Sequence, residues 1–503
     1  MTDETPANDQ PLAERGSNRS QRPSSEAFKR FIASQWAPRA DAPPARAEVA
    51  PFAAARRDRL SERFPGERLV VPAGPLKVRS NDTDYRYRPH SAFAHLTGLG
   101  ADREPDAVLV LDPAGSGHEA TLYFRPRAER DTEEFYADSR YGELWVGARP
   151  SLAEVEAELG LRCRHVDELP DALRKDVGED GVRVRVVPES DPAVEAEVRA
   201  ARAASGLGEQ EYSELDAALA EALSEMRLVK DSWEVTQMRR AVEASARGFA
   251  DIVRALPDAV GHERGERVIE TVFFSRARRE GNGVGYDTIA AAGEHACTLH
   301  WVRNDGPVRS GELVLVDAGV ELDSLYTADV TRTLPVDGVF TEAQRRVYQA
   351  VLDAADAAFA VARPGTRFRD LHAAAMQVIA ERLAEWGLLP VGAEESLDAE
   401  TGGYHRRWMV HGTSHHLGID VHDCAQARRE MYLDAELEPG MVFTIEPGLY
   451  FKADDLAAPQ DLRGIGVRIE DDVLVTSGGC ENLSGMLPRT PDDVEAWMRS
   501  LRA

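Results

Sequence analysis

The chain has 503 residues, of which 43% are hydrophobic and 29% are charged, and its formal net charge is −27. This length predicts about two domains, and the strong negative charge argues against nucleic acid or an anionic membrane as a partner. The four cysteines form no CxxC pair, which excludes a disulfide framework and a zinc ribbon. No apolar run is long enough to predict a transmembrane helix, and the N-terminal residues lack the pattern of a secretory signal. We therefore expect a cytoplasmic protein.

Residues 1–50 are predicted to form a disordered tail and linker. The beginning of this segment is rich in Pro, Ser, Asn, Asp and Arg, a composition that buries too little apolar surface to fold. Residues 25–36 could form one short amphipathic helix. Pro38, Pro43 and Pro44 then favour an irregular linker.

Residues 51–226 are predicted to form an N-terminal α/β domain. Short apolar runs at 68–72, 107–111 and 120–124 are typical of strands. Residues 152–159 and 193–204 have the pattern of helices, and a further helical stretch over 212–226 ends the domain.

Residues 227–490 are predicted to form a second domain, in which long helices are followed by strands. Thr341 and Gln344 make a capping box before a helix that Pro364 ends. Apolar residues at helical spacing over 371–386 predict another helix, with Gly387 at its end. Residues 491–503 are expected to be a C-terminal tail. The fold class is thus α+β, with the chemistry in the second domain.

Four carboxylates of the second domain stand where apolar residues are expected. Asp317 and Glu446 follow apolar runs, Asp329 precedes one, and Glu470 separates two. Burying an unpaired carboxylate is unfavourable by several kcal/mol, so each acid taken singly is best explained as a helix cap or an arginine partner. Four strands that end in acids are harder to explain in this way. If the acids converge, their repulsion requires cations, and metal ions are the simplest answer.

A histidine-rich segment, HGTSHHLGIDVHD, occupies residues 411–423. Gly412 and Gly418 interrupt it, which favours a strand or loop, so it is not the helical HExxH zinc motif. A single histidine is usually a satisfied polar residue, but this cluster accompanies four misplaced carboxylates. One imidazole with four carboxylates suits Mn²⁺, Fe²⁺ or Co²⁺ better than Zn²⁺. Cys424, next to the segment, is interpreted as a packing residue rather than a nucleophile.

Five segments resemble the signature sequences of the pita-bread-fold metallopeptidases, in the same order and at similar separations. They are VDAG at 316–319, ADVTRT at 328–333, the histidine-rich segment, TIEPGLY at 444–450 and GVRIEDD at 466–472. The resemblance implies a C-terminal pita-bread catalytic domain with two divalent metal ions, most readily Mn²⁺. The implied metal ligands are Asp317, Asp329, His415, Glu446 and Glu470, with Asp329 and Glu470 expected to serve both ions.

The same resemblance implies how peptide hydrolysis would proceed. Two metals would lower the pKa of a bridging water towards neutrality and supply hydroxide. Glu446 is the expected proton carrier, and His422 would stabilise the oxyanion or contact the peptide carbonyl. His300 and His411 are expected to line the cleft as further catalytic residues. Tyr450 and Arg468, beside His411, match positions that surround the proline ring of the substrate.

The first half of the chain narrows the resemblance to aminopeptidase P. Residues 79–98 and 143–149 are similar to that family's N-terminal domain, which methionine aminopeptidases lack. Asp82 and Trp145 match substrate-binding residues that relatives lend to a neighbouring subunit, so a homo-oligomer, a dimer or a tetramer, is implied. The expected substrates are peptides with proline at position two.

Three alternatives stay open. A prolidase would use the same metal set to cut Xaa-Pro dipeptides. A non-catalytic pita-bread module would bind peptides or proteins, although such relatives have generally lost metal ligands. An amidinohydrolase on this fold is disfavoured by the same complete ligand set.

Overall fold

The computed structural model describes residues 23–39, 43–81, 83–178, 181–203, 206 and 208–502. The disorder predicted for the first residues of the tail lies outside this part. The chain separates into two compact units, 1–219 and 220–503, and the division falls within helix α9 (Glu209–Glu225) rather than at its end, where the sequence predicted it. No helix of the described residues is long and apolar enough to cross a membrane.

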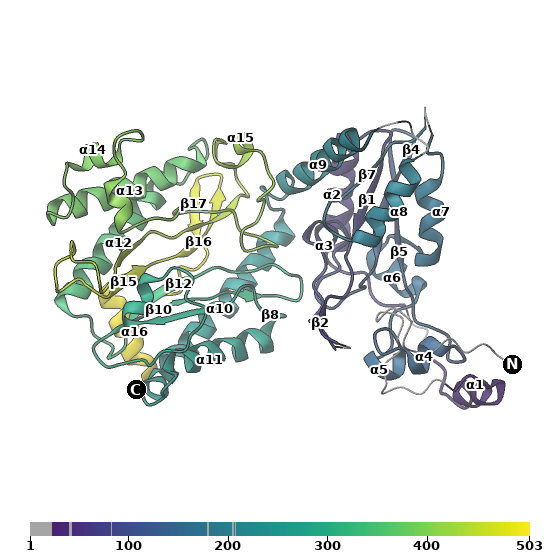
Figure 1. Cartoon of the computed structure of the whole chain (residues 1–503), viewed down its shortest axis with the longest axis horizontal. Helices are drawn as coiled ribbons and strands as arrows, with labels where there is room; N and C mark the ends of the chain where they lie inside the picture. The colour runs from purple at the N-terminus through teal and green to yellow at the C-terminus, as the bar shows by residue number, and fades with distance from the viewer. Residues whose placement is uncertain are drawn as a thin grey trace. The chain divides into compact units, whose positions relative to one another are not determined.

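The first unit is built on a five-stranded sheet of order β6-β5-β4-β1-β7, in which the outer pairs are parallel and the inner pairs antiparallel (Figure 1). Its strands carry valines that pack against leucines and valines of α7 and α8. The unit's elements are α1 (Glu26–Ala33), α2 (Ala50–Arg63), β1 (Arg68–Pro72), β2 (Val78–Ser80), β3 (Thr83–Asp84), α3 (Ser91–Thr97), β4 (Val108–Ala114), β5 (Gly117–Phe124), α4 (Glu133–Ala137), α5 (Glu143–Val146), α6 (Leu152–Leu159), β6 (Arg162–His165), α7 (Leu169–Arg174), β7 (Val184–Val186) and α8 (Pro192–Arg202). The strands and helices predicted for residues 51–226 are present, and the short helix predicted within residues 1–50 is α1.

The second unit places several small antiparallel sheets among the helix pairs α10–α11 and α12–α13 (Figure 1). Its helices are α10 (Ser232–Val260), α11 (Gly265–Glu280), α12 (Glu342–Val361), α13 (Phe368–Glu385), α14 (Ala393–Leu397), α15 (Arg429–Tyr432) and α16 (Pro491–Arg502). Its strands are β8 (Gly283–Val284), β9 (Ile289–Ala292), β10 (Leu313–Asp317), β11 (Val320–Glu321), β12 (Thr331–Pro335), β13 (Val442–Ile445), β14 (Gly448–Phe451), β15 (Ile465–Arg468), β16 (Asp471–Thr476) and β17 (Gly479–Asn482).

The C-terminal residues form a helix where the sequence analysis expected a tail. Helix α16 buries Pro491, Val494 and Met498 and contacts α10 and α12. The three buried residues recur at helical spacing, so one face of the segment is apolar and finds a partner surface in this unit. The capping box of Thr341 and Gln344 at the start of α12 is confirmed.

Close backbone approach at one glycine brings the acid-bearing strands together. A Cβ atom at Gly319 would lie 1.6 Å from the carbonyl oxygen of Ala328, so only glycine fits after β10. Strands β10 and β12 then pair antiparallel, with Asp317 opposite Thr331. This register places Asp317 near Asp329, two residues before Thr331.

Candidate metal centre

Asp317 and Asp329 meet at one end of the β10–β12 pair. Both are nearly buried, at 8% and 4% exposure. The hydroxyl of Tyr286, in the segment between β8 and β9, donates to Asp317 Oδ1 at 2.7 Å and to a carboxylate oxygen of Asp329. A single hydroxyl therefore fixes two carboxylates that come from different strands.

Glu470 is positioned by the neighbouring strand. Its backbone N–H donates to Thr331 O at 3.1 Å, and Thr331 Oγ1 donates to Glu470 Oε2 at 2.7 Å. The fully buried guanidinium of Arg332 donates to the Glu470 carbonyl at 2.7 Å and to Asp471 Oδ1 at 2.7 Å. The strand that follows Asp329 is thus tied to the segment that carries Glu470.

His415 and Glu446 complete the cluster from the opposite side. Strand β13 ends at Ile445, and the N–H of Glu446 donates to Thr413 O at 2.8 Å, so the two segments run side by side. His415 Nδ1 lies 3.2 Å from the His416 carbonyl, which leaves Nε2 facing Asp329 Oδ2 at 3.3 Å and Glu446 Oε1 at 3.5 Å. Ligand atoms of Asp329, His415 and Glu470 all lie within 4.8 Å of one another.

The electrostatics of the cluster show an excess of negative charge. Burial raises the pKa of Glu446 to about 7, and burial together with the charges of Asp329 and Glu446 holds the pKa of Glu470 well above its usual range. Burial also raises the pKa of Asp329. For His415 burial favours the neutral ring, but the hydrogen bond to Asp329 and the charge of Glu446 outweigh it and raise the pKa to about 9.

This donor set fits divalent cations. Four carboxylates converge, and the cationic groups that contact them are Arg468, whose Nη2 donates to Asp317 at 2.6 Å, and His415. Two positive charges do not neutralise four negative ones, and burial is the main reason why the carboxylates of Asp329, Glu446 and Glu470 have raised pKa values. Oxygen-rich sites with one imidazole suit hard or borderline cations such as Mn²⁺.

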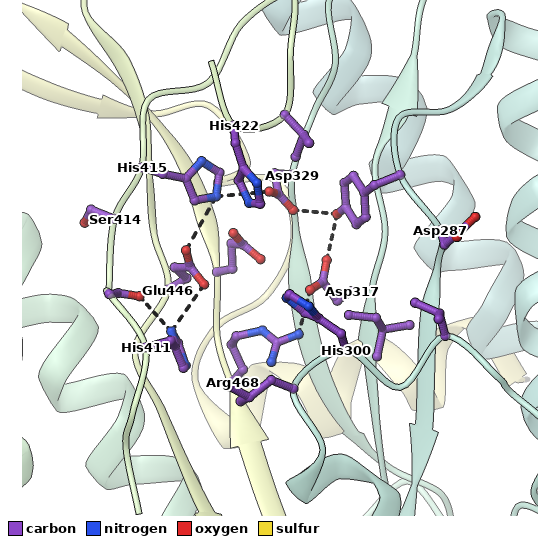
Figure 2. A pocket seen from close by; sticks show the side chains of 17 residues that line it. Asp287, His300, Asp317, Asp329, His411, Ser414, His415, His422, Glu446 and Arg468 are labelled. Carbon is purple, nitrogen blue, oxygen red and sulfur yellow. Dashed lines mark hydrogen bonds and ion pairs between the residues drawn. The ribbon is translucent and has the colours of Figure 1, made fainter. Parts of the chain in front are cut away.

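A cavity of about 550 Å³ opens beside the acids. Figure 2 shows the side chains of His411, His415 and His422 directed into the same space as the carboxylates. The predicted residues that line the cavity are His300, Asp317, Asp329, His411, His415, His422, Glu446, Arg468 and Glu470.

Tyr450 lies behind the cavity wall and connects two of its side chains. Its hydroxyl receives a hydrogen bond from Arg468 Nη1 at 3.2 Å and lies 2.7 Å from His411 Nε2. Burial and the charge of Arg468 lower the pKa of His411 to about 3. At neutral pH His411 is therefore an uncharged ring beside a fixed guanidinium.

The structure adds residues that the sequence reasoning missed. Tyr286 lines the cavity and holds two acids, but no motif singles out a tyrosine in this role. An apolar wall of Ile289, Leu299, Val302 and Val421 and the nearby Asp287 also line the cavity. Alternation in short apolar runs identifies such residues as buried, and it does not distinguish a cavity wall from a core.

Two predicted substrate-binding residues belong to the first half of the chain. Asp82 lies outside the described residues. Trp145 belongs to α5 in the first unit, where its indole N–H donates to the Tyr136 carbonyl at 2.8 Å and its side chain is 42% exposed. Their contribution from a neighbouring subunit stays a prediction.

Comparison with known proteins places these features in a family. Residues 236–477 match the metallopeptidase family M24, and residues 53–184 match the aminopeptidase P N-terminal domain. The chain therefore belongs to metallopeptidase family M24, in the group that carries the aminopeptidase P N-terminal domain. The resemblance noted from the sequence is confirmed.

Relatives over nearly the whole length carry one description. The chain is 54% identical to Xaa-Pro aminopeptidase 1 of Streptomyces coelicolor over 89% of this chain and 87% of the relative. It is 33% identical to Xaa-Pro aminopeptidase of Escherichia coli over 89% of this chain and 97% of the relative.

Solved structures of aminopeptidase P from Escherichia coli match this chain over nearly its whole length. A variant of Escherichia coli aminopeptidase P in complex with substrate has a TM-score of 0.77 at 31% identity and covers 92% of this chain and 100% of its own. The zinc-substituted enzyme in complex with product has a TM-score of 0.78 at 32% identity and covers 91% of this chain and 100% of its own. The predicted fold, an N-terminal domain followed by a catalytic metallopeptidase domain, is confirmed.

Proposed function

We propose that this chain is a metalloaminopeptidase that hydrolyses the bond between an N-terminal residue and proline at position two. The observation that carries the proposal is the convergence of Asp317, Asp329, His415, Glu446 and Glu470 on one cavity. These five residues would hold two divalent ions, for which Mn²⁺ is our first choice. Such ions, when bound, acidify a water molecule and polarise a carbonyl group.

The residues of the chain supply positioning and proton transfer. Glu446 lies at the edge of the acid cluster, 3.7 Å from His411 Nδ1, and is our candidate for moving a proton from the attacking water to the leaving amine. Burial and the charges of His415 and His300 lower the pKa of His422, so its neutral ring offers an N–H to the developing oxyanion. An enzyme must lower the barrier to peptide hydrolysis by more than about 8 kcal/mol, so proton transfer, oxyanion stabilisation and positioning must act together.

The part of the cavity wall formed by His411 and Arg468, with Tyr450 behind it, is our candidate subsite for the proline ring. The flat face of the uncharged His411 imidazole suits an apolar ring without a backbone N–H, and the Tyr450 hydroxyl supports that imidazole from behind. Arg468 is fully committed to Asp317, Tyr450 and Thr331, with Nε to Thr331 Oγ1 at 3.1 Å. It therefore holds this wall in place beside the acids.

We also propose a homo-oligomer, a dimer or a tetramer, in a cytoplasmic setting. Trp145 stands between Leu144 and Val146, and all three side chains are more than two-fifths exposed at 42%, 53% and 54%. Exposed apolar groups of this kind mark contact sites. The four cysteines are free, as expected in a reducing compartment.

The test combines metal analysis with turnover of three peptides. A Xaa-Pro-Xaa tripeptide should be cleaved, and a Xaa-Ala-Xaa tripeptide should not. Glu446→Gln and Asp317→Ala should abolish cleavage, whereas Glu438→Gln, an exposed acid near β13, should not. Exclusive cleavage of a Xaa-Pro dipeptide would establish a prolidase instead. Protein that binds Mn²⁺ and cleaves none of the peptides would contradict the proposal.

Light scattering tests the oligomer. Trp145→Ala should lower the assembly state or weaken cleavage without changing the metal content. A monomer with full activity would contradict the contribution of Trp145 in trans.

A further inference from the structure

The segment that carries His300 has no regular structure of its own. Residues 298–312, between a short 3₁₀ turn and β10, form neither helix nor strand. His300 and Val302 are exposed, yet both line the cavity together with Leu299, and Figure 2 shows the His300 side chain near Asp317 and Arg468. Something outside the segment must hold these side chains at the acid cluster.

Glu266, in the first turn of α11, supplies an anchor. It is 0% exposed and accepts four hydrogen bonds. Oε1 accepts from Ala292 N at 2.9 Å and lies 2.7 Å from His295 Nδ1, and Oε2 accepts from Trp301 Nε1 at 2.9 Å and from Gly306 N at 2.7 Å. The donors flank His300 on both sides in the sequence.

The anchored side chains also pack on one another. The rings of His295 and Trp301 are stacked, with centroids 3.9 Å apart and an interplanar angle of 23°. A Cβ atom at Gly306 would lie 2.6 Å from His295 Cε1 and 2.9 Å from Glu266 Oε2, so glycine is needed for this approach. The backbone thus closes around the carboxylate of Glu266.

Asn304 makes a second attachment to β9. Its Oδ1 accepts from Ala290 N at 2.9 Å and its Nδ2 donates to Thr288 O at 2.8 Å. Asn304 is 1% exposed and has a φ of 47°, a conformation that asparagine adopts more readily than most residues. Glu266 and Asn304 fix the segment on both sides of Val302.

A glutamate is required at position 266 because all of its neighbours donate. A carboxylate has two oxygens with about four acceptor sites, and four N–H groups fill them. Glutamine would turn an NH₂ group towards two donors, and burying a group with unsatisfied donors costs about 1–3 kcal/mol. Since Glu266 does not line the cavity, it acts on the reaction through the segment.

We propose that Glu266 is a positioning residue that holds His300, with Leu299 and Val302, against the metal cavity. The inference rests on the proposed aminopeptidase function for its kinetic effect. Its structural effect, the ordering of residues 298–306, is independent of that function. Outer residues that orient functional side chains typically change activity 10–100-fold when they are replaced.

A double-mutant cycle with hydrogen exchange tests the proposal. Glu266→Gln should lower kcat/KM for a Xaa-Pro-Xaa peptide about 10–100-fold, and in a His300→Ala background the same change should have an effect of less than about twofold. Glu263→Gln, an exposed acid three residues earlier, is the matched control and should change neither quantity. Equal losses in both backgrounds would overturn the proposal.

Hydrogen exchange measures whether Glu266 orders residues 298–306, and this measurement does not require an active enzyme. In Glu266→Gln the amides of residues 298–306 should exchange faster, while β10 and β15 keep their protection and the bound Mn²⁺ content stays unchanged. Unaltered exchange over 298–306 would overturn the proposal even in an inactive preparation.

If Glu266→Gln does not fold, Trp301→Phe is the alternative variant. It removes one donor to Glu266 and keeps a ring that can stack, and it should show the same local change to a smaller extent. Failure of Xaa-Pro-Xaa cleavage by the unmodified protein would instead refute the proposed function.

Discussion

The acids and the histidines of the site are held by different kinds of structure. Asp317, Asp329 and Glu470 are 2–8% exposed and lie at or beside strands whose ladders fix their spacing. His300 and His422 are exposed and stand in segments without helix or strand. Strands suit ligands whose separation must match cations, whereas loops suit residues that meet variable peptides. The acid side is therefore a frame fixed by strand pairing, whereas the histidine side consists of loop residues, of which His300 is held by the side-chain anchor of Glu266.

Removing the metal should give the largest effect, because Arg468 and His415 neutralise only part of the negative charge of the four acids. Chelation should reduce turnover by more than about a thousandfold, and added Mn²⁺ should restore it. If metal analysis shows that the chelated protein is metal-free and it still cleaves the peptide, the acids are not required as metal ligands.

The metal-free protein should also show a defined pH dependence of stability. In the folded protein the pKa of His415 is raised to about 9, above its ordinary value of about 6.5. Between pH 6.5 and 9 His415 is therefore protonated in the folded protein and largely unprotonated in the unfolded protein. Stability from this group is present below pH 6.5 and is lost as the pH rises towards 9. A bound cation replaces that proton, so the rise in Tm caused by Mn²⁺ should grow from pH 6.5 to 8.5. A rise that shrinks over this range would contradict the assignment of His415 as a ligand.

Replacing one strand-borne acid should be nearly as damaging. Asp317→Ala removes a proposed metal ligand and leaves Arg468 without its carboxylate partner, and we expect kcat/KM to fall about a thousandfold. Asp323→Ala, an exposed acid in the turn after β11, is the control. Metal content per chain should fall in the first variant only. Wild-type metal content in Asp317→Ala would exclude Asp317 from the ligands.

A loop histidine should have a smaller effect. His422→Ala should lower kcat about a hundredfold, as for the loss of one donor to an oxyanion, and should leave the metal content unchanged. His262→Ala, which replaces an exposed histidine after α10, should leave kcat unchanged. If His422→Ala releases metal, the two sides of the site are not separate in function.

The smallest effect is expected at Cys424. The residue is 0% exposed, and burial raises the pKa of its thiol above the ordinary value, so it should not react as a nucleophile. Cys424→Ala should keep kcat/KM within about twofold and lower the free energy of unfolding by about 1 kcal/mol. Denaturant unfolding and a thiol-labelling assay measure these effects. Loss of activity with unchanged stability would give this thiol a chemical role.

The sequence predicted the acidic residues of the site but not the residues that hold the site in place, and the reason is physical. A carboxylate at the end of an apolar strand conflicts with its surroundings, so Asp317 and Glu446 can be identified as candidate site residues without a structure. Tyr286 conflicts with nothing, since a tyrosine suits a core, and its role depends on acids 31 and 43 residues away. Glu266 is equally inconspicuous, because acids are common in the first turn of a helix. Helix α16 was missed because its apolar face involves only a few residues of a short segment.

Gly319 has a consequence for engineering the centre. The acid-bearing strands are held by their backbone ladder, and next to it Gly319 permits an approach so close that any side chain would meet the Ala328 carbonyl. Exchanging a carboxylate for another donor therefore leaves the strand spacing untouched. The metal preference could be redesigned by side-chain replacement alone, whereas any residue larger than glycine at 319 would force the strands apart whichever donors they carry.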